Sequence, residues 1–175
     1  MTAMESPQTT SIKTQRFGEV TFEANDLIEF PWGLPGFAHL RRFVALTLDE
    51  QPNFLWLQSA DDPAVALPAA DPWQMFPDYE PKLPAYATAA LELRNPDDFS
   101  LLCVVVVTKD AREMTMNLLA PIVINLKSRR ARQVMLENSG YSVRRPVPRT
   151  AESAVAQADP RPPGGAAHSQ EAARS

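Results

Sequence analysis

The sequence is poor in the residues that most often carry chemistry. Its 175 residues include one cysteine, two histidines and six glycines. His39 and His168 are far apart, so the clustered ligands that a metal site requires are missing. Six glycines leave no phosphate-binding loop, and no serine lies in a nucleophile elbow. These gaps argue against a metalloenzyme, a nucleotide-binding enzyme or a serine hydrolase, and no cofactor is expected.

The single cysteine, Cys103, has no internal partner for a disulfide and lies in the apolar run 101–107. A buried free thiol suits a reducing compartment. The run is far shorter than the roughly 20 residues that cross a bilayer as a helix. The first residues also lack the basic and apolar pattern of a cleaved secretion signal. We therefore expect a cytoplasmic protein.

Positive charge is scarce overall and concentrated in one segment. The formal net charge is −4 and the sequence pI is about 5.2, which weighs against nucleic acid as the default partner. Residues 43–126 hold twelve acids and four bases, whereas residues 127–149 hold seven bases and one acid. This pattern predicts a bipolar surface, whose acidic part either keeps the domain soluble or steers a basic partner. The basic stretch 127–132 has no interleaved aromatic residue for base stacking.

Short apolar stretches between turn-forming residues predict an all-β fold, a single antiparallel barrel-like or sandwich domain with one or two short helices. The run 99–108 is apolar on both faces, which predicts a central strand. Residues 84–91 start with proline and are rich in alanine, which predicts a short helix. The expected strands are residues 17–22, 27–30, 43–48, 54–59, 64–67, 99–108, 121–126 and 133–136.

Two prolines modify these strands. Pro68 lacks a backbone donor, so it should truncate the strand at 64–67 and place it at an edge or a bulge. Pro121 should separate residues 114–125 into two short strands that meet at a bend.

The ends of the chain are polar or of low complexity. Residues 1–15 contain few large apolar side chains, which predicts a flexible leader. Residues 149–175 are rich in alanine and proline with scattered charge, which predicts a disordered tail. The folded β domain is therefore expected to span residues 16–148.

The segment 72–79 is unusually rich in aromatic and apolar side chains and has proline near both ends. Such a segment either covers the core as a lid or presents a binding patch, and the lid is the commoner outcome. The neighbouring aspartates Asp61, Asp62, Asp71 and Asp78 could pair as acid and base, but each lies beside a turn former. Turn chemistry explains them more simply.

Five motifs, in this order and at these spacings, resemble the FliW family of flagellar assembly factors over residues 17–146. They are 16–20 (RFGEV), 30–37 (FPWGLPGF), 54–58 (FLWLQ), 76–80 (FPDYE) and 114–125 (MTMNLLAPIVIN). The resemblance implies a non-enzymatic protein that binds flagellin as a chaperone-like partner. It also implies binding to the translational repressor CsrA, so that free flagellin controls its own synthesis.

Charge and aromatic residues together suggest where a partner would bind. The expected partner-facing residues are Asp71, Phe76, Asp78, Tyr79, Glu80 and Asn117. The acidic middle of the chain suits CsrA, which the resemblance presents as a basic RNA-binding protein.

A second hypothesis is a small β-barrel enzyme or ligand-binding protein. In that case Trp56, Trp73 and Cys103 would line an interior cavity. The sequence offers no convergent polar groups for such a cavity.

Overall fold

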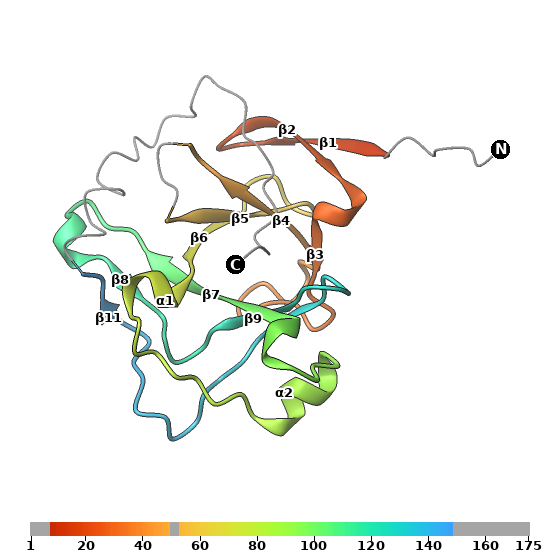
Figure 1. Ribbon diagram of the computed structural model, residues 1–175. Coiled ribbons are helices and arrows are strands. Elements are labelled where there is room, and N and C mark those ends of the chain that lie inside the picture. The colour runs from red at the N-terminus through yellow and green to blue at the C-terminus, as the bar shows by residue number, and fades with distance from the viewer. Residues whose placement is uncertain (1–7, 50–52, 149–175) are drawn as a thin grey trace.

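The computed structural model describes residues 8–49 and 53–148, and it is built mainly from short antiparallel strands (Figure 1). The strands are β1 Thr9–Thr14, β2 Gly18–Glu23, β3 Leu27–Glu29, β4 Arg42–Thr47, β5 Leu55–Ser59, β6 Ala66–Ala70, β7 Phe99–Val106, β8 Thr115–Met116, β9 Ile122–Asn125, β10 Ala131–Gln133 and β11 Arg145–Pro146. The helices are α1 Pro72–Met75 and α2 Ala85–Ala90, with single 3-10 turns at Ala24–Asp26, Pro96–Asp98 and Ala111–Glu113. The prediction of an all-β fold with one or two short helices is confirmed.

One large sheet holds most of the strands, in the order β10-β9-β7-β6-β5-β4-β3. Strand β8 pairs with β7 and β11 pairs with β8, while β1 and β2 form a separate hairpin that crosses the upper part of the molecule in Figure 1. The two end strands of the large sheet meet at a single bridge between Glu29 and Arg130, where the Glu29 amide donates to the Arg129 carbonyl at 2.9 Å. The sheet therefore curls round on itself, although the described residues form no closed barrel.

The β4–β5 hairpin was predicted from its polar connection and is antiparallel, with Leu46 opposite Trp56. The β1–β2 hairpin covers one face of this pair. On β2 the side chains alternate, so Val20 and Phe22 are buried while their neighbours are exposed. The ring of Phe17 meets that of Trp56 edge-on, with their centres 5.8 Å apart.

Strand β1 differs from the prediction, since residues 9–14 are paired along their whole length with β2. The expectation of a loose leader was wrong for this segment. Thr14 closes the turn, because its hydroxyl accepts from the Phe17 amide at 2.8 Å and donates to the Gly18 carbonyl at 2.9 Å. Most side chains of β1 are exposed, so backbone pairing rather than apolar burial holds it. The first part of the predicted leader lies outside the described residues, as does the whole of the predicted tail, 149–175.

Pro68 does not end its strand. Strand β6 begins at Ala66, later than predicted, and continues through the proline to Ala70. Pro68 faces Trp56 of β5, whereas pairing with β7 involves only Ala69 and Ala70. Proline has no backbone N–H and so cannot donate to a neighbouring strand. At Pro68 the strand is paired with β5 but not with β7, so the missing donor is tolerated.

Strand β7 is central, as predicted. Strands β9 and β8 pair with its first and last parts, with Ile122 opposite Leu102 and Met116 opposite Val105, and β6 pairs with its middle. The predicted bend between the two short strands is present. Asn117 closes it, because its side-chain oxygen accepts from the Ala120 amide at 3.0 Å. Strand β10 starts before the predicted 133–136 segment, since its pairing with β9 begins at residue 131.

Candidate functional site

Helix α1 forms in the aromatic segment for which the sequence indicated only a lid or a patch. The Asp71 carboxylate caps it by accepting from the Trp73 amide at 2.9 Å, and Pro72 occupies the first turn, where no amide donor is needed. The helix ends at Phe76, because Pro77 disfavours helical geometry in the residue before it. Local chemistry therefore sets both ends of this single turn.

Tyr79 anchors the segment that follows α1. Only 3% of Tyr79 is exposed, and its hydroxyl donates to the Leu118 carbonyl at 2.7 Å. The indole nitrogen of Trp73 donates to the Tyr79 carbonyl at 2.8 Å, and the Tyr141 ring lies edge-on with its centre 4.7 Å away. Burial raises the pKa of Tyr79 far above its ordinary value, so the phenol remains a neutral donor. This residue holds the site together and presents little surface itself.

Beside Tyr79 lies a groove of about 480 Å³. The groove is lined by residues 75–79, which include the end of α1, and by Leu118, residues 140–142 and Arg145. The Arg145 guanidinium lies 5.6 Å from the centre of the Phe76 ring. The groove thus combines aromatic and aliphatic surface with one carboxylate, from Asp78, and one guanidinium, a composition typical of a protein-binding site.

The six predicted site residues divide into two groups. Phe76, Asp78 and Tyr79 line the groove, and the Glu80 amide next to them donates to the Tyr141 hydroxyl at 2.9 Å. Glu80, Asp71 and Asn117 are not part of the lining. Asp71 caps α1 and Asn117 closes the bend before β9.

The structure supports the lid for part of this segment, while the binding patch stays a prediction. Met75 and Tyr79 are buried in the core, so they act as a lid. Trp73 is 39% exposed, and Pro77 and Asp78 are exposed as well. The same short segment therefore closes the core with one face and leaves the other exposed.

The buried thiol close to this segment is not set up as a nucleophile. Burial raises the pKa of Cys103 to about 12, because a thiolate would lose its hydration there. Burial also raises the pKa of Asp71, although the Trp73 amide bond opposes this shift. A raised pKa disfavours the anion, so neither the Cys103 thiol nor the Asp71 carboxyl supplies a reactive anion to the groove.

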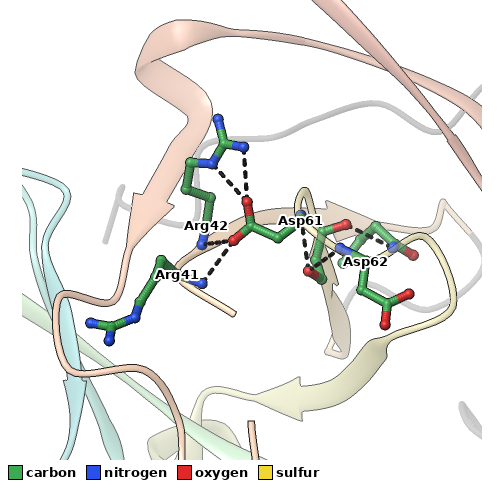
Figure 2. A network of polar contacts seen from close by, with 6 residues as sticks. Arg41, Arg42, Asp61 and Asp62 are labelled. Atoms are coloured by element: carbon green, nitrogen blue, oxygen red, sulfur yellow. Dashed lines mark hydrogen bonds and ion pairs between the residues drawn. The ribbon is translucent and has the colours of Figure 1, made fainter. Parts of the chain in front are cut away.

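The aspartates after β5 do not form an acid–base pair, as the turn hypothesis predicted. Figure 2 shows the Asp61 carboxylate between the Arg42 side chain and the amides of Arg41 and Arg42. The neighbouring carboxylate, from Asp62, accepts from the Ala64 amide at 2.9 Å. Burial raises the pKa of Asp61, but hydrogen bonds from both arginine residues outweigh it, so the net pKa is lowered. The network joins the start of β4 to the loop after β5. Because its pKa is lowered, Asp61 is a carboxylate and has no proton to donate.

The basic stretch 127–132, in the hairpin between β9 and β10, has no aromatic residue interleaved in its own sequence, but aromatic residues from elsewhere in the chain lie beside this hairpin. Trp32, in the loop after β3, and Tyr86, on α2, lie against Arg130 and Arg132 of this hairpin. The two rings come from segments far from the hairpin in the sequence. No local spacing could have indicated the contact.

The hypothesis of an interior cavity is not supported by the positions of its three residues. Trp56 packs with Phe17 beneath the β1–β2 hairpin, and Cys103 belongs to a different part of the core. Trp73 is at the surface. They do not line a common space.

Among residues 8–49 and 53–148, no three or more histidine, cysteine or carboxylate side chains are grouped so as to hold a metal ion. No helix in that part of the chain is long and apolar enough to cross a membrane.

Comparison with known proteins gives one consistent result. The family model described as FliW protein matches residues 10–147. The flagellar assembly factor FliW of Pseudothermotoga lettingae is 42% identical over 130 residues, covering 74% of this chain and 83% of the relative. The FliW protein of Moorella thermoacetica is 40% identical over 134 residues, covering 76% and 85%.

A solved structure agrees with the sequence comparison. The crystal structure of a flagellar assembly factor FliW superposes with a TM-score of 0.72 at 33% sequence identity. It covers 78% of this chain and 96% of that chain. The similarity therefore extends over nearly the whole of the solved protein.

Proposed function

Since the chain belongs to the FliW family, whose members are assembly factors and not enzymes, we propose that it serves flagellar assembly by binding flagellin and a CsrA-type translational regulator. Binding of the two partners is mutually exclusive in this proposal. Flagellin that accumulates in the cytoplasm occupies the protein and releases the regulator, which then represses flagellin synthesis. Secretion of flagellin reverses the exchange.

The observation that carries this proposal is the groove beside α1. It presents the half-buried Phe76 and the exposed Pro77 next to the charged Asp78 and Arg145, on a backbone fixed by Tyr79. Aromatic anchors within a rim of charge are typical of protein interfaces. Because Tyr79 holds the groove in place, a partner does not have to pay for ordering it.

Charge around the groove favours a basic partner at its acidic side. The side chains of Asp78 and Glu80 are exposed, and they belong to the part of the chain in which acids outnumber bases three to one. A regulator with a basic surface would be attracted there at low salt. Release of RNA by that regulator would follow from linkage if it binds this protein better in its RNA-free state.

The proposal is tested by titrating the full chain with purified flagellin and with the regulator, separately and in competition, using calorimetry and size-exclusion chromatography. We expect both partners to bind and flagellin to displace the regulator. If neither partner binds, the proposed function fails. If both bind at once in a ternary complex, the exchange mechanism fails.

Variants locate the surface. The double variant Asp78→Lys/Glu80→Lys should bind the regulator more weakly at low salt while its melting temperature stays unchanged. The matched control is Asp97→Lys/Glu113→Lys, which makes the same change of charge at exposed positions outside the groove. Equal affinities of the two double variants for the regulator would show that the groove is not the regulator's binding site.

A further inference from the structure

A stack of arginine and aromatic side chains lies on the basic hairpin between β9 and β10. The Arg132 guanidinium is 4.7 Å from the centre of the Trp32 ring and 5.0 Å from the centre of the Tyr86 ring. Arg130 lies 5.5 Å from the same tryptophan ring. Trp32 is 43% exposed and Tyr86 is 49% exposed, so the stack is at the surface.

The stack joins three segments that are held independently. The side-chain amide of Asn125, at the end of β9, donates to the Leu91 carbonyl at 2.7 Å, which ties the hairpin to the end of α2. The Asn125 oxygen also accepts from the amides of Lys127 and Ser128, which fixes the turn. The loop that carries Trp32 is closed by the Phe30 amide, which donates to the Arg41 carbonyl at 2.7 Å.

The guanidinium groups in the stack have unused donors. Within the described residues, the side chains of Arg130 and Arg132 make no hydrogen bond or ion pair to the protein. A guanidinium carries five N–H groups in its plane, and stacking on a ring occupies its face while leaving those groups at its edge. The contacts with Trp32 and Tyr86 therefore hold the arginines in place without using the donors that recognise an anion.

We propose that Arg130 and Arg132 bind the carboxylates of an acidic peptide segment in a partner protein. The planar fork of a guanidinium matches a carboxylate in a bidentate manner. Stacking restrains both side chains before a ligand arrives, which lowers the entropy lost on binding. The exposed Lys127 on the same hairpin adds positive charge for steering an acidic segment.

The same features favour an acidic peptide over nucleic acid. Nucleic-acid binding depends on neutralising many phosphates, and the chain as a whole carries a net charge of −4. A base would need the face of an aromatic ring for stacking, and arginines already lie against the rings of Trp32 and Tyr86.

This surface is separate from the groove beside α1, because the two share no residue. It is also of opposite character, since arginines dominate it. The inference therefore goes beyond the proposed function and adds a second docking surface to the protein.

The test uses the full chain and a fluorescent peptide of alternating glutamate and serine, with fluorescence anisotropy at low salt as the readout. The double variant Arg130→Gln/Arg132→Gln should bind this peptide at least about tenfold more weakly, since loss of even one charge-assisted contact accounts for a factor of that size. Arg132→Lys keeps the charge but loses the planar fork, so it should also bind more weakly. The matched control Arg94→Gln/Arg144→Gln removes two exposed arginines outside the stack.

Three results would overturn the proposal. The first is no binding of the acidic peptide, or equal binding of the same peptide with glutamine in place of glutamate. The second is an equal loss in the control double variant, which would show a response to net charge alone. The third is tighter binding of a single-stranded RNA of matched charge, lost in the Arg130→Gln/Arg132→Gln protein, which would assign the stack to nucleic acid. Unchanged melting temperatures confirm that each variant is folded.

Discussion

Asp61 joins the start of β4 to the loop after β5, and its replacement by asparagine gives a sharp test of the structure (Figure 2). One carboxylate oxygen accepts from the amides of Arg41 at 2.8 Å and Arg42 at 2.9 Å. The other accepts from Arg42 Nε at 2.8 Å and forms an ion pair with the terminal guanidinium nitrogen at 2.8 Å. The Asp61 side chain is only 22% exposed, so water replaces these contacts incompletely.

The expected loss of stability follows from the number of hydrogen-bond acceptors that asparagine lacks. Asparagine has one side-chain oxygen, so whichever way its amide is turned, an NH₂ group faces two donors that a carboxylate oxygen accepted before. Hydrogen bonds to a charged group contribute about 1.5–3 kcal/mol each, and partial exposure reduces this. The exposed ion pair adds less than about 1 kcal/mol. We expect Asp61→Asn to lower the free energy of unfolding by about 2 kcal/mol.

The neighbouring aspartate provides a matched control. Within the described residues, the Asp62 side chain accepts one hydrogen bond, from the Ala64 amide, in the geometry of an Asx turn. Asparagine serves equally well in such a turn, since its oxygen can accept the same bond. Asp62→Asn makes the same change in charge and shape, yet it should cost less than about 0.5 kcal/mol.

Urea unfolding followed by tryptophan fluorescence measures both variants, because Trp56 is buried and will report its exposure. With a slope of about 2 kcal/mol/M, the transition midpoint of Asp61→Asn should fall by about 1 M. That of Asp62→Asn should stay close to the parent value. Equal midpoints for the two variants would refute the argument from geometry.

Acid provides a second test of the same network. The folded-state pKa of Asp61 is lowered, so its stabilisation is present above its unfolded-state pKa of about 3.9 and is lost as pH falls through the lower folded value. Asparagine does not titrate. The stability difference between the parent protein and Asp61→Asn should therefore be largest near neutral pH and shrink below about pH 4. A constant difference down to pH 3 would contradict the role assigned to the carboxylate.

Three further predictions concern other positions. Tyr79→Phe removes the hydroxyl that donates to the Leu118 carbonyl and should cost about 1–2 kcal/mol in urea unfolding; full stability would show that this buried carbonyl needs no donor. Gly33→Ala should lower the melting temperature strongly, because φ is +68° and a Cβ would lie 2.6 Å from the Ala38 Cα, at a cost of at least about 2 kcal/mol; an unchanged melting temperature would exclude this turn geometry. Cys103, with its pKa raised by burial to about 12, should react with iodoacetamide at pH 8 on the order of a thousandfold more slowly than in urea, and rapid labelling of the folded protein would show an accessible thiol.

The parts of the fold that the sequence could predict are those with strong local signals. Residues 43–59 alternate apolar strands with a polar, proline-containing connection, and they form the antiparallel hairpin of β4 and β5. The continuous apolar run from residue 99 indicated a strand with neighbours on both sides, which β7 has. Helix α2 was also predictable from its alanine content, although Pro84 caps the helix instead of starting its first turn.

The parts that it could not predict depend on long-range partners. The polar residues of β1 are typical of a flexible leader, and the sequence does not show that β2 pairs with them. In the sequence Pro68 is typical of a strand end. Only the register shows that Pro68 is paired with β5 and not with β7. Intrinsic preference is a weak guide where pairing decides the outcome.

The candidate site shows the same division. The sequence indicated the aromatic segment after Asp71 and proposed Phe76, Asp78 and Tyr79, which the fold brings to one groove. It could not tell which of these side chains would be buried, because burial of Tyr79 depends on a carbonyl 39 residues further along the chain. Asn117 was proposed as partner-facing on the expectation that the last strands fold back beside the aromatic segment, whereas its side chain closes a turn.

The two surfaces described here depend on the same interior frame. Strand β9 pairs with β7 and ends at Asn125, whose side chain ties the hairpin of Arg132 to α2. The bend before β9 supplies the Leu118 carbonyl that holds Tyr79 in the groove. A short stretch on either side of Pro121 therefore positions both the aromatic groove and the arginine stack. Although this stretch contains no acid or base, its Leu118 carbonyl and its Asn125 side chain hold segments that come from distant parts of the chain.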